Sequence, residues 1–249
     1  MIGTGDLQGH WRRAWLRAPG IEDRLTSVHW MQCGSLYADI RIPADRPDTR
    51  GAAGLSDLPP RILRRLLDAE GFAGHITVEN DICTWERRIN WHGATKAIDA
   101  GHMAFGQGGA LTETGIHADY SELWHRLDDD PSEGLELTGP SGRTGFLVSV
   151  GHRFVLGLGD PAAPATADVI AALDADRRPD GLEEVFARLH VLGRWSGAIG
   201  IADQATNPLI QGRTVLTRTA EGLVLHETDF HGASRQELLT PCPAPVVAA

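Results

Sequence analysis

One short segment brings three chemically active side chains to the same face of an expected strand. In residues 36–42 (LYADIRI) polar and apolar positions alternate, so Tyr37, Asp39 and Arg41 point to one side. A guanidinium beside a carboxylate and a phenol can orient a small polar ligand, and it can bind a ligand carboxylate through two parallel hydrogen bonds. This face is the first candidate binding site, and Asp39 is also a candidate acid/base group.

A second group of residues from the same half is expected to converge on this face. Glu79 follows an apolar strand, and Arg87 shares a face with Trp85 and Trp91 if their strand is regular. If these side chains look into a barrel, they place opposite charges beside aromatic walls, which suits a small polar or carboxylate-bearing ligand. The further candidate ligand-binding residues are Glu79, Trp85, Arg87, Trp91, Tyr120 and His29.

The segment IHADY supplies a candidate catalytic pair. His117 and Asp119 are two residues apart, so on a strand both point to one face. A histidine beside a carboxylate can act as a general base, because the pairing fixes its tautomer and shifts its pKa. We therefore expect His117, Asp119 and Asp39 to carry any acid/base chemistry.

The same residues also fit a purely structural interpretation. Antiparallel strands often bury one face and expose the other, in which case Asp39 and Arg41 form a weak surface ion pair. Large aromatic side chains are unfavourable to expose, so a half rich in tryptophan has either a bulky core or an aromatic-lined cavity. The first half contains Trp30, Trp85, Trp91 and Trp124.

Eleven histidines raise the question of a metal site: His117 and Asp119 would share a strand face and His29 could converge on them, but surface or hydrogen-bonded core histidines are the expected interpretation. A metal ion needs three or four converging ligands, and the sequence has no HExxH or CxxC motif. The glycine-rich nucleotide motifs and GxSxG are absent too. We expect no metal and no cofactor; haem held by a barrel histidine is an alternative that the colour of the protein would decide.

Composition restricts the partners and the cellular compartment that we expect for this protein. The 249 residues carry a net charge of −10, which argues against nucleic acid or an anionic membrane as partner, since both need a basic surface. No stretch approaches about 20 apolar residues, and the first residues lack an apolar segment of signal-peptide length. Three cysteines without disulfide-like spacing are typical of a reducing compartment. We expect a cytoplasmic protein and leave a homodimer open.

Local patterns predict a mainly β chain with short helices. Residues 26–43 indicate a hairpin with its turn at Gly34-Ser35, and residues 57–71 indicate one short helix. A second helical stretch is expected over residues 166–192, broken near Pro179. The other segments read as short strands, and the 29 glycines spread among them favour a barrel or sandwich over a parallel sheet.

The two halves show a weak internal repeat. Residues 90–93 (NWHG) and 229–232 (DFHG) both read polar-aromatic-His-Gly, and each follows an expected strand. Upstream of each corner lie a strand pair, a loop, a helix and a further strand. A shared order of elements indicates a duplicated unit of ~110–130 residues. That is the size of a small closed barrel with room for one ligand.

Three segments carry a resemblance to a known superfamily: residues 10–15 (HWRRAW), residues 37–43 (YADIRIP) and the repeated corner. With them the chain resembles the lipocalin-like (calycin) superfamily, and more particularly a small fungal and bacterial family with two such barrels in tandem. The Gly-x-Trp signature is present as Gly9-His10-Trp11, and the second half has no matching tryptophan. The resemblance implies two tandem lipocalin-like antiparallel β-barrels with short helices: residues 1–132 with the ligand site, residues 133–240 as a mainly structural barrel, and a flexible tail of residues 241–249.

These observations lead to one functional hypothesis and one alternative. The hypothesis is a small-molecule-binding, lipocalin-like protein whose partner is a small polar or carboxylate ligand in the N-terminal barrel. If it is catalytic, cofactor-independent acid/base chemistry (isomerase, lyase or hydrolase) suits the available groups; whether it is an enzyme stays open. The alternative is a non-catalytic structural or protein-interaction module with filled barrels.

Overall fold

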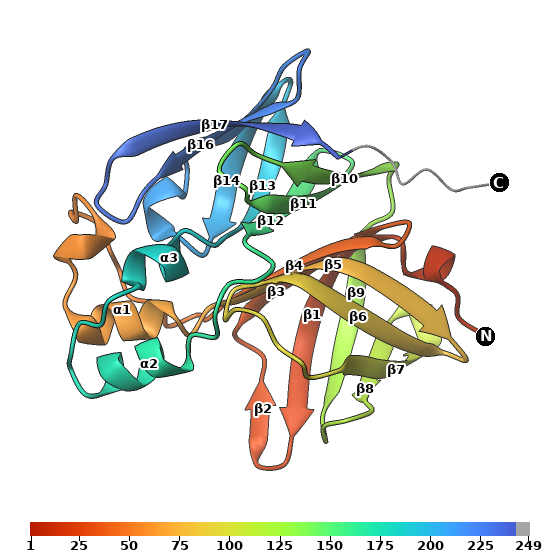
Figure 1. The fold of residues 1–249 in the computed structure, drawn as a ribbon. Helices are drawn as coiled ribbons and strands as arrows, with labels where there is room; N and C mark the ends of the chain where they lie inside the picture. Colours follow the sequence, from red (N-terminus) through yellow and green to blue (C-terminus); the bar gives the residue numbers. More distant parts are fainter. Residues whose placement is uncertain (243–249) are drawn as a thin grey trace.

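Strand-forming segments in the first 128 residues build a nine-stranded sheet, of which eight strands close into an antiparallel barrel (Figure 1). The computed structural model describes residues 1–242 of the chain. β9 pairs back with β1 and closes the barrel, while β2 forms a short hairpin on the end of β1. The strands are β1 (Gly9–Ala18), β2 (Ile21–Asp23), β3 (Ser27–Cys33), β4 (Leu36–Ile42), β5 (Glu70–Glu79), β6 (Ile82–Asn90), β7 (Asp99–Phe105), β8 (Leu111–Gly115) and β9 (Ser121–Asp128).

The second half forms another closed antiparallel barrel of eight strands. β17 returns to β10, where Leu137 pairs with Pro241 and Thr138 with Thr240. The mainly β fold with two tandem antiparallel barrels is therefore confirmed. The strands are β10 (Ser132–Thr138), β11 (Thr144–Val150), β12 (Arg153–Gly159), β13 (Leu189–Ser196), β14 (Ile199–Ala205), β15 (Thr214–Arg218), β16 (Leu223–Thr228) and β17 (Ser234–Pro241).

The boundary between the halves lies in a short connection. β9 ends at Asp128 and β10 begins at Ser132, so the boundary predicted after residue 132 falls one residue inside β10. The predicted tail also starts too early, because Pro241 is still paired in β17 and the Cys242 amide donates to the carbonyl of Glu136 at 2.8 Å. The rest of that predicted tail, residues 243–249, lies outside the described residues.

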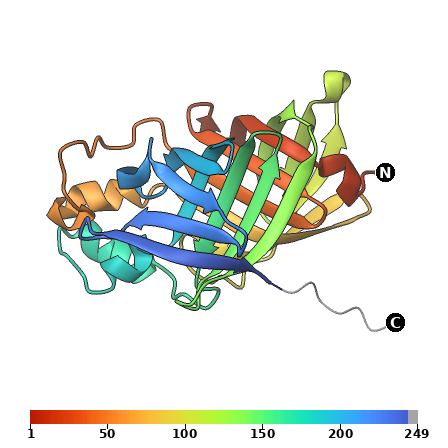
Figure 2. The same cartoon turned by 90° about the horizontal axis from the view of Figure 1, so that it is seen from above.

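The α-helices lie together at one end of the molecule, opposite the N-terminus (Figures 1 and 2). The predicted first helix is confirmed, and the second helical stretch contains two helices but ends earlier than expected. Residues 189–192 belong to β13. Both faces of this strand are buried there, so its sequence does not alternate between polar and apolar residues and cannot be distinguished from a buried helix. The helices are α1 (Pro60–Leu66), α2 (Ala167–Asp174), α3 (Leu182–Phe186) and the 3₁₀ turns η1 (Thr4–Leu7), η2 (Leu55–Asp57), η3 (Gln107–Gly109) and η4 (Pro208–Ile210).

The two barrels pack wall against wall through apolar side chains that point out of both. On β4 the outward residues Ala38, Ile40 and Ile42 are buried against the second barrel, together with Phe146 and Val155. The apolar face of β4 thus serves the interface between barrels. Its polar face is left to point into the first barrel.

The interiors of the two barrels differ in chemistry. The second is filled by aliphatic and aromatic side chains, among them Leu147, Phe154 and Leu156. The first contains a cluster of large aromatics around Trp11 and Trp30 together with polar groups. The first interior therefore combines aromatic walls with a buried charge network.

The two aromatic-His-Gly corners make reciprocal contacts between the halves. In the first corner the His92 amide donates to Asn90 Oδ1 at 3.0 Å, and in the second His231 does the same to Asp229 at 3.0 Å. Gly93 and Gly232 both have φ of 86°, and a Cβ on either would overlap a carbonyl of the other half, at Pro164 and Ala53 respectively. Each corner therefore lies against the loop that precedes the helices of the opposite half.

These corners are not equivalent positions of a duplicated barrel. The first follows β6, the fifth strand around its barrel, whereas the second follows β16, the seventh. Their predicted equivalence was wrong, because a tight Asx turn before glycine can follow any strand. The shared order of strands and helices is present: β4 and β12 each precede the helices of their half.

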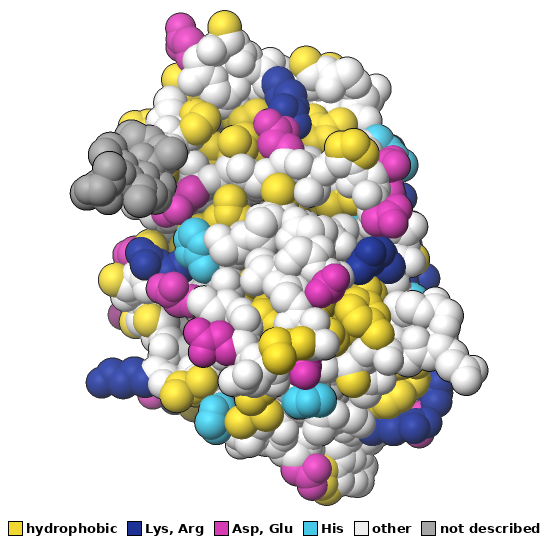
Figure 3. Space-filling view, turned by 90° about the vertical axis from the view of Figure 1, so that its right-hand side faces the viewer, with side chains coloured by type: hydrophobic (Ala, Val, Ile, Leu, Met, Phe, Trp, Pro, Cys, Tyr) yellow, Lys and Arg dark blue, Asp and Glu magenta, His cyan; other side chains and the backbone are white. Residues whose placement is uncertain are grey.

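Hydrophobic side chains on the face shown in Figure 3 lie in small groups among acidic and basic ones. None of the helices within residues 1–242 has the length and apolar character needed to cross a bilayer.

Candidate functional site

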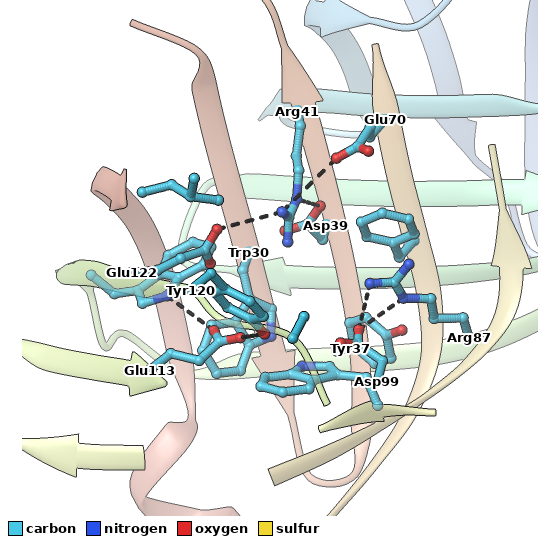
Figure 4. Close-up of a pocket in the computed structure, with 15 residues that line it drawn as sticks. Trp30, Tyr37, Asp39, Arg41, Glu70, Arg87, Asp99, Glu113, Tyr120 and Glu122 are labelled. Atoms are coloured by element: carbon cyan, nitrogen blue, oxygen red, sulfur yellow. Dashed lines mark hydrogen bonds and ion pairs between the residues drawn. The ribbon is translucent and has the colours of Figure 1, made fainter. Parts of the chain in front are cut away.

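A cavity of about 370 Å³ lies inside the first barrel (Figure 4). Its size is that of a small-molecule site. Every residue that lines it belongs to the first half, so the second barrel does not cover its opening. The lining residues are Leu16, Trp30, Tyr37, Asp39, Arg41, Glu70, Phe72, Trp85, Arg87, Asp99, Glu113, Ala118, Tyr120, Glu122 and Trp124.

The polar face of β4 forms one wall of this cavity. Tyr37 and Asp39 are 1% and 4% exposed, and Arg41 is partly buried beside them. The alternation in LYADIRI directs these three inward, because the intervening residues contact the second barrel. The structure thus places them in the barrel interior and not on a solvated face. Their role in binding a ligand stays a prediction.

Arg41 lies at the centre of an ion-pair network. Its Nε lies 3.0 Å from Asp39 Oδ1, and its Nη1 lies 3.6 Å from Glu122 Oε1 and 3.9 Å from Glu70 Oε2. Arg13 approaches the same Glu122 oxygen at 2.6 Å from the other side. Two guanidiniums therefore compensate several carboxylates that are largely withdrawn from water.

Burial changes the proton affinity of Asp39. Loss of solvation raises the pKa of Asp39 to about 6, even though Arg41 opposes the shift, and the carboxylates of Glu122 and Glu70 add to the rise. The pKa of Arg41 is raised as well, because these three carboxylates outweigh the effect of its burial. Arg41 is therefore a fixed positive charge, while Asp39 changes its protonation near neutral pH.

Arg87 forms a second ion pair from β6, which β5 separates from β4. Its Nε and Nη2 approach Asp99 Oδ2 at 2.8 and 2.6 Å. The guanidinium also lies 3.6 Å from the ring centroid of Phe72, a cation–π distance. Phe72 lies 5.1 Å from the guanidinium of Arg41 as well, so the ring separates the two cations.

Glu113 is a buried carboxylic acid at the floor of the cavity. It accepts hydrogen bonds from the Tyr120 hydroxyl at 2.6 Å and the Trp124 indole nitrogen at 3.2 Å. Burial and the nearby Glu122 charge raise the pKa of Glu113 to about 8, against the opposing effect of the Tyr120 hydrogen bond. Glu113 is thus largely protonated at neutral pH, and its carboxyl group can donate a proton.

Two buried polar atoms of the cavity have no hydrogen-bond partner in the protein. They are the Tyr37 hydroxyl and Glu122 Oε2, and both residues are 1% exposed. A buried polar atom left unpaired is unfavourable by about 1–3 kcal/mol. Both atoms belong to residues that line the cavity.

Tryptophans form the apolar part of the site. Trp30 lies edge to face with Trp85 at 6.1 Å and with Trp124 at 5.7 Å, and it stacks on Trp11 at 6.0 Å between ring centroids. Trp11 and Trp30 are direct neighbours across β1 and β3, so the strand register sets their contact. The predicted aromatic wall is present around the polar groups.

Three predicted residues do not line the cavity and are exposed. His117 and Asp119 lie in the bend between β8 and β9, and Glu79 ends β5. The strand alternation assumed for IHADY does not apply to an irregular connection, so Ala118 and Tyr120 of this segment line the cavity while His117 and Asp119 do not. Contrary to the prediction, these three residues do not converge with Asp39.

Trp91 and His29 are also placed elsewhere. Opposite Gly74 the β5–β6 register shifts by one residue, so the strand is not regular between Arg87 and Trp91. Trp91 is buried against Phe186, with ring centroids 5.8 Å apart. The ring of His29 lies on the outward face of β3 at 2.9 Å from His10, and burial lowers the pKa of His29 to about 3.

Sequence reasoning did not select several lining residues as site residues. A signal was present in β9, where Glu122 and Trp124 are two apart and share a face, as do Leu111 and Glu113 in β8. A carboxylate on the face of a buried apolar residue indicates an interior charge. The lining residues not predicted for the site are Leu16, Trp30, Glu70, Phe72, Asp99, Glu113, Ala118, Glu122 and Trp124.

The second barrel has a cavity of about 510 Å³ at one end. Arg143 is held there by Glu227 at 2.7 and 3.0 Å and by Glu237. Unlike the first cavity, it has no unpartnered buried side-chain atom among its described lining residues. Within residues 1–242 no group of three or more His, Cys, Asp or Glu side chains is arranged to hold a metal ion.

Fold and cavity together define a class: a tandem pair of eight-stranded antiparallel β-barrels with a polar, aromatic-walled cavity in the first. The chain is similar in structure to the uncharacterized protein YLR301w from Saccharomyces cerevisiae, with a TM-score of 0.51 and 10% sequence identity over 96% of this chain and 100% of the yeast chain. At that identity the similarity concerns the fold alone. No family model and no curated protein sequence matches the chain.

Proposed function

We propose that the first barrel binds a small polar molecule in its interior, as lipocalin-like barrels with one enclosed ligand do. One observation carries this proposal: the Tyr37 hydroxyl and Glu122 Oε2 are buried, line the cavity and lack partners. A protein without a ligand would be more stable with apolar atoms at these positions. A bound molecule that hydrogen-bonds to both atoms explains why they are buried without a partner in the protein.

The surrounding network supports this proposal. Ion pairs hold Arg41 on β4 and Arg87 on β6 in place, so the polar groups are oriented before a ligand arrives. The tryptophans offer apolar contact area to the rest of the molecule. Size and composition are typical of a site that orients a ligand with few polar groups among aromatic ones.

The test is a thermal-shift screen of the whole protein against small polar metabolites that include amines, alcohols, sugars and carboxylates. We expect at least one compound to raise the melting temperature of the wild type. Tyr37→Phe removes an unpaired hydroxyl, so it should fold with equal or higher stability and lose most of that shift. His117→Ala, at an exposed position outside the cavity, is the matched control and should keep it.

Two results would count against the proposal. The first is a wild-type protein that responds to no compound, which favours the filled structural module. The second is a Tyr37→Phe variant that responds as the wild type does.

A second candidate function is cofactor-independent acid/base catalysis in the same cavity. It is favoured by two carboxyl groups whose pKa values lie near neutrality, Asp39 at about 6 and Glu113 at about 8. In this scheme Asp39 accepts a proton and Glu113 donates one. Carbon-13 NMR of the two carboxyl groups tests it: titration of both below pH 5 removes the candidate.

A further inference from the structure

The charges that line the first cavity are unequal in number. Its wall carries five carboxyl groups, of which the largely protonated Glu113 adds no negative charge, and two guanidiniums, Arg41 and Arg87. Arg13 lies behind Glu122 and is shared with Asp23 at 2.5 Å, so it does not balance the excess. The carboxyl groups are those of Asp39, Glu70, Asp99, Glu113 and Glu122.

Both lining guanidiniums are already occupied. Arg87 directs two nitrogens at Asp99 and covers the face of Phe72, and Arg41 is surrounded by Asp39 and Glu122. An incoming carboxylate would have to displace one of these internal partners and would meet several like charges at short range. The two-point recognition of a ligand carboxylate expected from Arg41 is therefore disfavoured.

The acceptor that remains free belongs to a carboxylate. Glu122 uses Oε1 for Arg13 and Arg41, while Oε2 is buried and unpartnered. A charged donor is the strongest partner for such an oxygen, because hydrogen bonds between ions are about twice as strong as neutral ones. The Tyr37 hydroxyl, also unpartnered, can accept from the same or a neighbouring donor.

The aromatic walls fit the same kind of group. Trp30, Trp85 and Trp124 line the cavity alongside the carboxylates, and Tyr120 completes that side. Ring faces attract ammonium and guanidinium groups, most strongly where water is excluded. Carboxylates and indole rings in one cavity of about 370 Å³ form the environment that recognises a small organic cation.

We propose, as a refinement that rests on the ligand-binding function above, that the first barrel selects a small organic cation bearing an ammonium group. The ammonium donates to Glu122 Oε2. The organic part packs against the tryptophans around Trp30. The cation offsets the excess of carboxylates that the two lining arginines leave.

Matched probes on one scaffold test the charge preference directly. Isothermal titration of the wild type with phenethylamine, 2-phenylethanol and 3-phenylpropionate compares ammonium, hydroxyl and carboxylate on the same ring. A second set of n-pentylamine, 1-pentanol and hexanoate repeats the comparison without the ring. In at least one set we expect the amine to bind at least tenfold more tightly than the alcohol, and the carboxylate to bind most weakly.

Two variants examine the residue that we assign to the cation. Glu122→Gln should weaken the amine by tenfold or more and leave the alcohol nearly unchanged. Glu86→Gln changes an exposed carboxylate on β6 that does not line the cavity, and it should alter neither. If Glu122→Gln fails to fold, Glu70→Gln reports instead: its side chain is 44% exposed, and a three- to tenfold loss of amine affinity is expected.

The outcomes distinguish a failure of the cation preference from a failure of ligand binding itself. If the alcohol or the carboxylate equals or exceeds the amine in both sets, the cation preference is wrong while ligand binding stands. If only a neutral or acidic metabolite from the thermal-shift screen binds, the cation preference is wrong in the same way. If no probe and no metabolite binds, both proposals are wrong.

Discussion

Arg41 on β4 and Glu122 on β9 meet inside the first barrel, with 3.6 Å between Nη1 and Oε1. The side chains are 20% and 2% exposed. Arg13 binds the same oxygen at 2.6 Å, so both cations share one oxygen of the carboxylate. This leaves the other oxygen of Glu122 free, and the ligand-binding proposal follows from that asymmetry.

Removing Arg41 should destabilise the fold strongly. In Arg41→Ala the buried carboxylates of Asp39 and Glu122 lose a shared counter-charge, and breaking such a network is unfavourable by about 3–5 kcal/mol. Urea unfolding followed by tryptophan fluorescence measures the change. Arg50→Ala, in an exposed pair with Asp48, is the control and should unfold as the wild type does. Equal stability of the two variants would show that the network is solvated.

Glu113 should make the protein less stable as the pH rises. Its pKa is raised to about 8 in the folded state, from 4.5 when unfolded, by burial and by the charges of Glu122 and Asp99, against the effects of Tyr120 and Arg41. The folded state therefore holds the proton more tightly, and its contribution is complete below pH 4.5 and lost as the pH rises through 8. Glu113→Gln, which cannot ionise, should lose less stability than the wild type between pH 5 and 9 in urea titrations. Parallel curves for the two proteins would contradict this.

His190 should make the protein less stable as the pH falls. Both of its ring nitrogens are buried without a partner, and burial, with a smaller effect of His92, lowers the pKa of His190 to about 3. The unfolded state then binds the proton more tightly, so stability is present above pH 6.5 and is lost as the pH falls toward 3. His190→Leu should reduce this acid-side slope, and the His190 ring resonances should not titrate between pH 8 and 5. A resonance that moves with a midpoint near 6 would show that the ring is accessible to water.

The bulge between β5 and β6 requires a glycine at position 74. A Cβ at Gly74 would overlap the carbonyl oxygen of Glu86 and approach the Arg88 amide to 2.9 Å. Gly74→Ala should therefore lower the free energy of unfolding by about 2 kcal/mol or more, since a packed backbone cannot move aside cheaply. Gly5→Ala, where a Cβ meets open space, is the control and should stay within about 0.5 kcal/mol of the wild type. Chemical denaturation of both variants makes the comparison.

Regular strands were the part of the fold that sequence patterns could predict. The alternation in LYADIRI has only two possible orientations on a strand, so Tyr37, Asp39 and Arg41 had to share a face. Which face points inward depends on what covers the other. The second barrel covers it here, and alternation along β4 contains no information about that partner.

Three of the five misplaced site residues lie where the backbone departs from a regular strand. Trp91 follows a bulge, and His117 and Asp119 lie in a bend, so a period of two did not apply. Glu113 and Glu122 share faces with buried apolar residues, yet a carboxylate is usually assigned to solvent from its type alone. The burial of Glu122 depends on its ion pairs with Arg13 and Arg41, which come from strands distant in the sequence.

The reciprocal corners at Gly93 and Gly232 have a consequence for how the molecule comes apart. The Ser56 amide donates to the Phe230 carbonyl at 2.9 Å, and the Thr166 amide donates to the His92 carbonyl at 3.0 Å, so each half supplies backbone partners that the other lacks. Separating the halves would leave amides and carbonyls of both to water, along with the apolar walls between them. Calorimetry should accordingly record a single heat-absorption peak, with neither barrel melting ahead of its neighbour.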